Sequence, residues 1–269
     1  MVGQTKIQAL LNNLTYKSFP NPLLLIGEDG CGKTLTSQII ASKLNIELKN
    51  ISEALTSETI DDIYLCPIPT LYFINTSKFL SGNKVDKIEA SLLKFLEEPP
   101  QNAKLVLTCT DINRLKDTIV NRCRIWTFAP YTIEELKNFT SDETILQVAH
   151  TPGQVLSYIE QSPDKMKELA EKIIKKIHLA SPSNVFAICN QLSFEEPIQK
   201  DTFNIDLFVP VLEYAAAQLY ITEESDNYYN IYSRILKLKE RLKVPYAKKE
   251  HLFSQFLMEL KLDELVVKS

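Results

Sequence analysis

The sequence predicts an α/β fold with a parallel sheet, followed by a small helical lid and an all-helical C-terminal domain. Over the first 130 residues, short apolar runs alternate with helical patterns, whereas helical periodicity dominates the remainder. In addition, three of the six glycines fall within six residues of one another, directly after the first apolar run. Because glycine is scarce elsewhere in the chain, this cluster indicates a segment whose backbone needs conformations that other residues rarely adopt.

Four apolar runs predict the strands of the sheet. They do not alternate with polar residues, which suits strands that are covered on both faces. These runs are residues 22–26, 71–75, 104–109 and 124–128. Helices are expected between the runs, at residues 34–44, 56–64 and 86–98.

After Pro130 we expect no further strands. Thr132 and Glu135 form a capping-box pattern at the start of a short helix. Short helices are expected at residues 133–139, 142–149 and 153–161, and longer ones from Pro163 onward, where apolar residues recur at helical spacing. The chain should therefore form three domains: an α/β core at 1–130, a helical lid at 131–163 and a helical C-terminal domain at 164–269.

Composition places the chain among globular proteins that bury a core. The 269 residues are 45% hydrophobic and 24% charged, and the net charge of −4 argues against a protein that coats nucleic acid by itself. The five cysteines are widely spaced and form no C-x-x-C pair, so we expect no zinc site, no disulfide framework and a cytoplasmic location. No secretory signal and no apolar run of membrane-spanning length is found, so we expect no membrane partner.

The glycine cluster forms a phosphate-binding motif. The stretch GEDGCGKT satisfies G-x-x-x-x-G-K-[ST] between an apolar run and a helical pattern. Lys33 supplies a charge for the β- and γ-phosphates, and the Thr34 hydroxyl can bind Mg²⁺. Backbone N–H groups of such a loop point inward at phosphate oxygens, beside the positive end of the next helix, and the glycines that allow this are Gly27, Gly30 and Gly32. We therefore expect ATP or ADP with Mg²⁺ as cofactors.

The carboxylates needed for hydrolysis are missing from their expected place. A P-loop ATPase carries one acidic residue for Mg²⁺ and a second for the attacking water at the end of a neighbouring strand. The best such strand, 71–74, is followed by Asn75 and Thr76. Thr76 cannot act as a base near neutral pH, and losing a positioned base costs about 10²–10⁴-fold in rate. An alternative is that Glu28, Asp29 or Glu89 supplies the missing carboxylate, but the simpler interpretation of each is a solvent-exposed surface residue. We expect a site that binds nucleotide and turns it over poorly.

Three further stretches occur in a fixed order: SLLKFLEEPP at 91–100, LVLTCTD at 105–111 and NRC at 121–123. They resemble the L-L-K-x-L-E-E-P-P motif, the sensor-1 strand and the S-R-C motif of the clamp-loader branch of the AAA+ ATPases. The bacterial gamma and delta-prime subunits of DNA polymerase III belong to this branch. Shorter stretches at 2–4, 150–156 and 241–246 also resemble family landmarks, so the resemblance touches nearly the whole chain.

The resemblance implies a P-loop AAA+ core, a lid, and a helical collar that holds the subunits in a ring. It implies that Arg122 is an arginine finger acting in trans on ATP held by a neighbouring subunit. It also implies nucleotide contacts by Thr110 at sensor 1, by Gln154 in the lid and by Leu35 beside the phosphate loop. The implied partners are other clamp-loader subunits in a hetero-oligomer, the sliding clamp and primer-template DNA. The simpler interpretation is that Arg122 pairs with acidic surface residues.

The helix expected to end before Pro99 carries negative charges that oppose its own dipole. Glu97 and Glu98 place negative charge in its last turn, where each carboxylate opposes the helix macrodipole at a cost of about 0.3–1 kcal/mol. Such a conflict suggests a cationic partner or a functional surface. The alternative is an exposed helix end with screened charges.

Several positions depart from the family pattern. Asn75 and Thr76 stand where active members carry Asp-Glu, Gln154 replaces a lid Arg or Lys, and Asn121 replaces the Ser of S-R-C. The four-cysteine zinc module of bacterial relatives is absent, because Cys66 is the sole cysteine between the phosphate loop and the second predicted strand. These departures favour a delta-prime subunit, which does not hydrolyse ATP. An active AAA+ motor or remodeller remains an alternative, while a P-loop small-molecule kinase is disfavoured by the helical C-terminal region.

Overall fold

The computed structural model describes most of the chain, namely residues 2–51, 57–76, 92–93, 95–176, 192–193, 203–244 and 248–267. Its contacts divide the chain into two compact units. The first comprises Met1–Asn138 with Thr151–Gly153, and the second Phe139–His150 with Gln154–Ser269. The finer division into a core, a lid and a collar stays a prediction.

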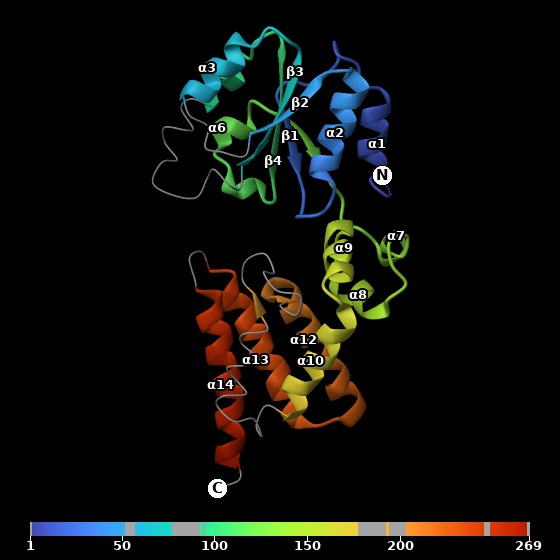
Figure 1. The fold of residues 1–269 in the computed structure, drawn as a ribbon, viewed down its shortest axis with the longest axis vertical. Coiled ribbons are helices and arrows are strands. Elements are labelled where there is room, and N and C mark those ends of the chain that lie inside the picture. Colours follow the sequence, from blue (N-terminus) through green and yellow to red (C-terminus); the bar gives the residue numbers. More distant parts are fainter. Residues whose placement is uncertain are drawn as a thin grey trace. The chain divides into compact units, whose positions relative to one another are not determined.

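Five parallel strands form the sheet of the first unit within the described residues (Figure 1). The order is β2-β3-β4-β1-β5, and the strands are β1 (Leu23–Ile26), β2 (Glu47–Ile51), β3 (Thr70–Asn75), β4 (Ala103–Cys109) and β5 (Arg124–Thr127). The predicted α/β fold with a parallel sheet is confirmed, and four of the strands match the expected runs to within one residue. The sequence analysis missed β2, because its residues ELKNI are mostly polar and exposed and form no apolar run.

Helices cover both faces of this sheet. In Figure 1, α1 (Thr5–Asn12) and α2 (Lys33–Leu44) lie on one side, and α3 (Ser57–Leu65) and α6 (Asp117–Val120) on the other. Successive residues of β1 serve the two sides: Leu23 and Leu25 belong to the cluster that includes Ile7 and Ile40, whereas Leu24 belongs to the cluster that includes Ile63 and Ile119. β1, β3 and β4 are therefore buried on both faces, as their uninterrupted apolar runs predicted, whereas the edge strand β5 exposes three of its four residues.

The helix expected at 86–98 is only partly described. Residues 92–93 and 95–97 are helical, while 86–91 and 94 lie outside the described residues, as do the landmark residues 245–246. The C-terminal part of this helix packs on α3, where the Tyr64 and Phe95 rings meet edge to face with centroids 5.8 Å apart. The Tyr64 hydroxyl also donates to the Glu98 carbonyl at 3.0 Å.

The second unit is built mainly of helices. α12 (Ile205–Glu223) packs against α8 (Glu143–Val148), α10 (Pro163–Lys176) and α13 (Asp226–Leu242), and α13 also packs against α14 (Lys249–Val267). The expectation that no strand follows Pro130 was wrong, because β6 (Leu192–Ser193) and β7 (Phe203–Asn204) form a short parallel pair. Two-residue strands are too short to leave a period-two pattern in the sequence.

Two short helices lie around the boundary between the units. The capping box predicted at the start of α7 (Ile133–Leu136) is present: the Glu135 N–H donates to the Thr132 hydroxyl, and the Thr132 N–H donates to the Glu135 carboxylate at 2.9 Å. α9 (Pro152–Glu160) begins with Pro152, a residue whose fixed φ suits the first helical position.

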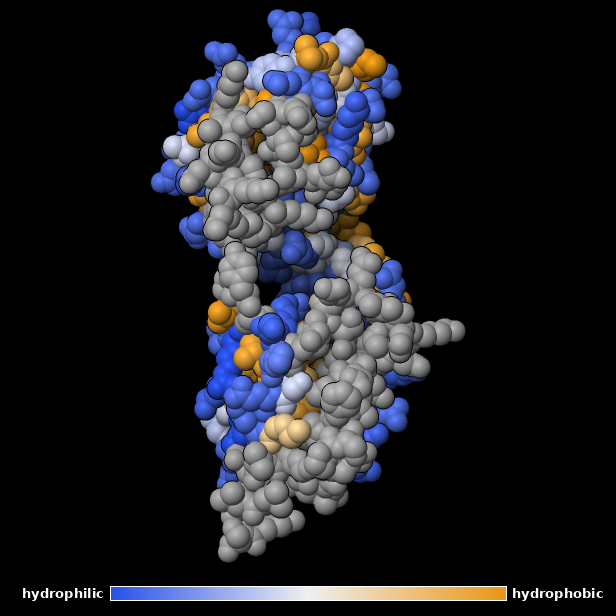
Figure 2. Space-filling model, turned by 60° about the vertical axis from the view of Figure 1, so that its left-hand side comes forward, coloured by the Kyte–Doolittle hydropathy of each residue, from blue (hydrophilic) through white to orange (hydrophobic). Residues whose placement is uncertain are grey.

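One helix in the described part of the chain meets the length and composition criterion for a membrane span. α12 is long and apolar enough to span a bilayer by length and composition, which the sequence analysis did not anticipate. A core helix of a globular domain can meet the same criterion, and α12 buries Phe208, Leu212 and Ala216. On the face drawn in Figure 2, hydrophilic residues predominate over apolar ones among those described. This single helix is weak evidence for a membrane span.

Candidate nucleotide-binding site

The phosphate-binding motif follows the central part of the sheet. β1 lies between β4 and β5, and the loop leaves its carboxyl end to enter α2. The Gly27 N–H donates to the Cys109 carbonyl at the end of β4 at 3.2 Å, and the Phe128 N–H donates to the Ile26 carbonyl at 2.8 Å. The loop therefore sits at the carboxyl edge of a parallel sheet, where ligands of such folds bind.

Steric constraints explain why glycine occupies each of the three positions of the motif. Gly30 and Gly32 have φ values of 80° and 106°, a left-handed conformation that side chains rarely adopt. A Cβ atom on Gly27 would lie 2.8 Å from both the Cys31 Sγ and the Phe128 Cβ. Two glycines thus set the backbone path of the loop, and the third lets the loop pack against its neighbours.

Lys33 brings a positive charge to the middle of the loop. Its Nζ donates to the carbonyls of Gly27 at 2.5 Å and Glu28 at 2.8 Å, and its side chain is only 10% exposed. Thr34 and Leu35, in the first turn of α2, are exposed. The left-handed glycines, the buried ammonium and the N-terminus of a 12-residue helix fit the phosphates of a nucleotide, and the exposed Thr34 hydroxyl fits Mg²⁺.

Cys31 lies inside the loop but is no candidate nucleophile. Its side chain is buried, and burial raises the pKa of the thiol, with the neighbouring Lys33 acting in the opposite direction. A thiol with a raised pKa stays protonated near neutral pH, and the thiolate is the reactive form. Cys31 therefore serves to pack the loop.

The end of β3 lies at the same edge of the sheet as the loop. Asn75 pairs in register with Thr108, two residues before Thr110, so the sheet brings Asn75, Thr76, Thr110 and the loop to one edge. Thr76 is 3% exposed, and its hydroxyl donates to the Thr108 carbonyl at 2.8 Å. This hydroxyl joins the end of β3 to β4.

Arg122 lies at the amino ends of the parallel strands, opposite the carboxyl ends where the phosphate loop lies. It comes between α6 and β5, and the first residue of β5, Arg124, pairs with Leu23, the first residue of β1. Its guanidinium donates to the Glu97 carboxylate at 2.5 Å and to the Thr118 carbonyl at 2.7 Å. The structure therefore does not bring Arg122 to the phosphate loop of its own chain. The ion pair expected by the simpler interpretation is present, and it gives Glu97 the cationic partner that its place in the helix suggested.

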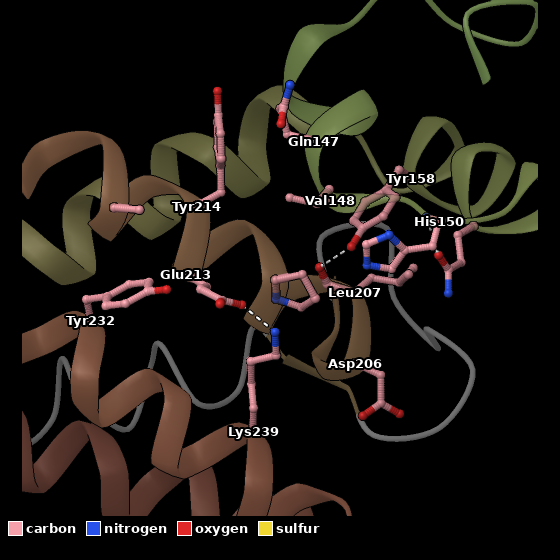
Figure 3. Close-up of a pocket in the computed structure, with 13 residues that line it drawn as sticks. Gln147, Val148, His150, Tyr158, Asp206, Leu207, Glu213, Tyr214, Tyr232 and Lys239 are labelled. Carbon is pink, nitrogen blue, oxygen red and sulfur yellow. Dashed lines mark hydrogen bonds and ion pairs between the residues drawn. The ribbon is translucent and has the colours of Figure 1, made fainter. Parts of the chain in front are cut away.

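Gln154 belongs to the second unit. Its side-chain oxygen accepts the His150 N–H at 2.7 Å, and the residue lines a pocket of about 460 Å³ among the helices of that unit. Figure 3 shows two pairs in the pocket wall, Glu213 with Lys239 and the Tyr158 hydroxyl with the Leu207 carbonyl, the latter at 3.0 Å. The nucleotide role of Gln154 stays a prediction.

Several residues that hold the loop were missed by the sequence analysis. Phe128 contacts the loop after β5, and three groups farther along the chain, on Tyr131, Thr151 and Gly153, donate hydrogen bonds to its carbonyls. The stretch around Thr151 was noted only as a family landmark. No spacing in the sequence signals a contact over more than 100 positions.

Comparison with known proteins finds relatives among the subunits of DNA polymerase III. A family model described as DNA polymerase III, delta subunit matches residues 83–132. DNA polymerase III subunit gamma of Buchnera aphidicola subsp. Acyrthosiphon pisum is 27% identical over 58% of this chain and 55% of the relative. The chain is thus similar to gamma and delta subunits of DNA polymerase III. It also aligns over 91% of its length with 75% of the gamma subunit of the Baizongia pistaciae strain, at 23% identity.

Other matches have the same character. DNA polymerase III subunit tau of Escherichia coli is 26% identical over 56% of the chain but only 28% of its own length. The chain thus spans about half or less of several relatives that it matches. A crystal structure of a DNA polymerase III gamma subunit-related protein from Thermotoga maritima shares the fold, with a TM-score of 0.52 and 14% identity over 95% of this chain and 98% of that one.

Proposed function

We propose that this chain is a clamp-loader subunit that binds ATP or ADP but hydrolyses ATP slowly or not at all. The observation that carries the proposal is the state of Thr76. This residue occupies the place where a catalytic carboxylate is needed, yet it is buried and its hydroxyl is bonded to the Thr108 carbonyl. A side chain in that position cannot accept a proton from water, so this position supplies no general base.

The residues of the loop would divide the work of binding. The backbone N–H groups and the α2 N-terminus would bind the phosphates, with Lys33 adding a charge to the β- and γ-phosphates and Thr34 holding Mg²⁺. Bound Mg²⁺ neutralises phosphate charge. Leu35, Thr110 and Gln154 are proposed as further contacts to the nucleotide.

Arg122 is proposed to act on the ATP of a neighbouring subunit. In this chain it lies at the edge of the sheet opposite the phosphate loop, which supports a role in trans over one in cis. An arginine brought to a γ-phosphate stabilises the charge that develops in the transition state. Its partner in this chain, Glu97, would have to exchange for that phosphate.

The proposed setting is the clamp loader of a bacterial cytoplasm. The partners would be other clamp-loader subunits in a hetero-oligomer, the sliding clamp and primer-template DNA, with residues 164–269 providing the collar. The missing carboxylates favour a delta-prime role within this family. The intact phosphate loop and the likeness to gamma subunits favour the alternative, an active motor subunit.

Hydrolysis by the isolated protein separates these two roles. Steady-state ATPase activity should lie far below one turnover per second, and the purified protein should retain bound nucleotide. A rate near one per second without partners would favour the motor role. Lys33→Ala, which removes the charge at the phosphates, controls for contaminating ATPases.

A complex reconstituted from co-expressed gamma-type and clamp subunits tests Arg122. Size exclusion should first show the chain in a hetero-oligomer, and a persistent lone monomer would count against the assembly role. Arg122→Ala should then lower DNA-stimulated hydrolysis by about 10³-fold or more, since an arginine finger contributes 10³–10⁵ in rate. The nucleotide affinity of the variant chain itself should not change, because Arg122 is remote from its own loop.

A further inference from the structure

The carbonyl groups of the phosphate loop face a set of hydrogen-bond donors outside the loop. The Thr151 hydroxyl donates to the Asp29 carbonyl at 2.8 Å, the Gly153 N–H to the Gly30 carbonyl at 3.0 Å, and the Tyr131 hydroxyl to the Cys31 carbonyl at 2.9 Å. Three successive carbonyls are thus held by residues that lie more than 95 positions away in the sequence.

These contacts fix the orientation of three successive peptide planes. In a trans peptide the C=O and the following N–H point in opposite directions. Holding the three carbonyls outward therefore turns the N–H groups of Gly30, Cys31 and Gly32 the other way, toward the side where a phosphate would bind. The Cys31 N–H points away from the outward-held Gly30 carbonyl and donates across the loop to the Glu28 carbonyl at 3.3 Å, a contact that a bound phosphate would replace.

The fit between the donors and the loop is close. A Cβ atom on Gly153 would lie 2.4 Å from the Gly30 Cα and 3.1 Å from the Gly30 carbonyl oxygen, so no larger residue fits without moving the loop. Thr151 is 2% exposed. Burial raises the pKa of the Tyr131 hydroxyl, which keeps its proton available to the Cys31 carbonyl.

We propose that Tyr131, Thr151 and Gly153 form a bracket of positioning residues that pre-orients the phosphate-binding N–H groups of the loop. A pre-oriented loop loses less conformational freedom when it binds an anion, so the bracket raises affinity without touching the nucleotide. It also joins the loop to the start of α9 through main-chain and hydroxyl contacts rather than through a cationic side chain. The inference rests on nucleotide binding at this loop.

Binding of a fluorescent Mg-ADP analogue to the full chain is the first test. Tyr131→Phe and Thr151→Val, which remove one donor each with little change in shape, should each weaken affinity about fivefold. Gly153→Ala should weaken it at least about tenfold, since the new methyl group displaces Gly30. Thr151→Ser keeps the donating hydroxyl and should recover most of the affinity.

The matched control is Thr222→Val in α12. Its hydroxyl also donates to main-chain carbonyls, those of Gln218 at 2.9 Å and Leu219 at 3.2 Å, but it belongs to the second unit. This variant should bind Mg-ADP as the wild type does. Thermal unfolding of every variant identifies any that lose affinity by failing to fold; Gly153→Ala is informative here, since alanine is the better helix former and should not destabilise α9 by itself.

Amide hydrogen exchange without nucleotide gives a second, independent readout. In Tyr131→Phe and Thr151→Val the amides of Gly30, Cys31 and Gly32 should exchange faster than in the wild type, while those of β1 should not change. If the wild type failed to bind Mg-ADP, the proposed function would fail, yet the exchange rates would still decide whether the bracket orders the loop. Equal affinity and equal exchange in the wild type and all three variants would overturn the bracket.

Discussion

At the scale of single residues, Gly27 shows how little space the phosphate loop has. Gly27→Ala places a methyl group 2.8 Å from the Cys31 sulfur and the Phe128 Cβ, so either the loop or Phe128 must move. We expect a loss of about 1–3 kcal/mol in the free energy of unfolding, as for other overpacked sites, and at least a tenfold loss of Mg-ADP affinity. Urea unfolding and nucleotide titration measure these effects. Wild-type affinity in this variant would show that the loop does not need its present path.

The pair of Glu97 and Arg122 gives a second prediction at this scale. Both side chains are more than one third exposed, so solvent screens their attraction and the pair should add only about 0.2–1 kcal/mol to stability. A double-mutant cycle with Glu97→Gln and Arg122→Gln, followed by urea unfolding, measures this coupling directly. It should shrink further at high salt. A coupling well above 1 kcal/mol would mean that Arg122 is a structural residue that cannot leave Glu97 for a partner's phosphate.

At the scale of elements, α8 depends on Asp142 at its N-cap. The Asp142 carboxylate accepts the Thr144 N–H at 2.8 Å and the Ile145 N–H at 3.2 Å, and it also pairs with Lys167 of α10. Burial by itself would raise the pKa of Asp142, but these N–H groups and Lys167 together lower it below its ordinary value of 3.8. The ionised carboxylate is therefore the form that stabilises the folded chain.

The sign of the pH effect follows from this lowered pKa. The stabilisation is complete above about pH 4 and is lost as the pH falls through the folded-state pKa. Asp142→Ala should cost about 1 kcal/mol at pH 7, whereas Asp142→Asn, which still caps the helix, should cost less. Urea unfolding at pH 7, 5 and 3 should show both differences shrinking only at the lowest pH. A difference that grew toward acid would contradict the assignment.

The elements also show what a sequence can reveal. Strands covered on both faces leave apolar runs, so β1, β3 and β4 were predictable almost to the residue. The edge strand β5 was also predicted to within one residue, although three of its four residues are exposed. β2 pairs with β3 alone, at the edge of the sheet, and its polar residues carry no such signal. α1 was missed because it begins after Gln4, which is in a left-handed conformation and makes no side-chain cap. Local signals fail where an element is defined mainly by its partners.

At the scale of the whole molecule, the same distinction separates the parts of the site. The motif residues from Gly27 to Thr34 were predictable because the chemistry of a phosphate site is local in sequence. That Arg122 lies at the end of the sheet opposite the phosphate loop follows only from the strand order. The contacts of Tyr131 and Thr151 with the loop depend on the folding of distant segments onto it. Sequence reasoning therefore identified what binds the phosphates but not what orders the loop.

The division into two units makes a prediction about unfolding. The whole phosphate loop and its bracket belong to the first unit, and the second unit offers only the proposed contact of Gln154, so Mg-ADP should stabilise mainly the first unit. At a Mg-ADP concentration 100 times the dissociation constant, the free energy of unfolding should rise by about 2.7 kcal/mol. This corresponds to a rise of roughly 5–10 °C in the unfolding temperature of a unit of about 140 residues. Scanning calorimetry should show two transitions, of which one moves with Mg-ADP. In Lys33→Ala neither should move, and equal shifts of both transitions in the wild type would mean that the units unfold as one body.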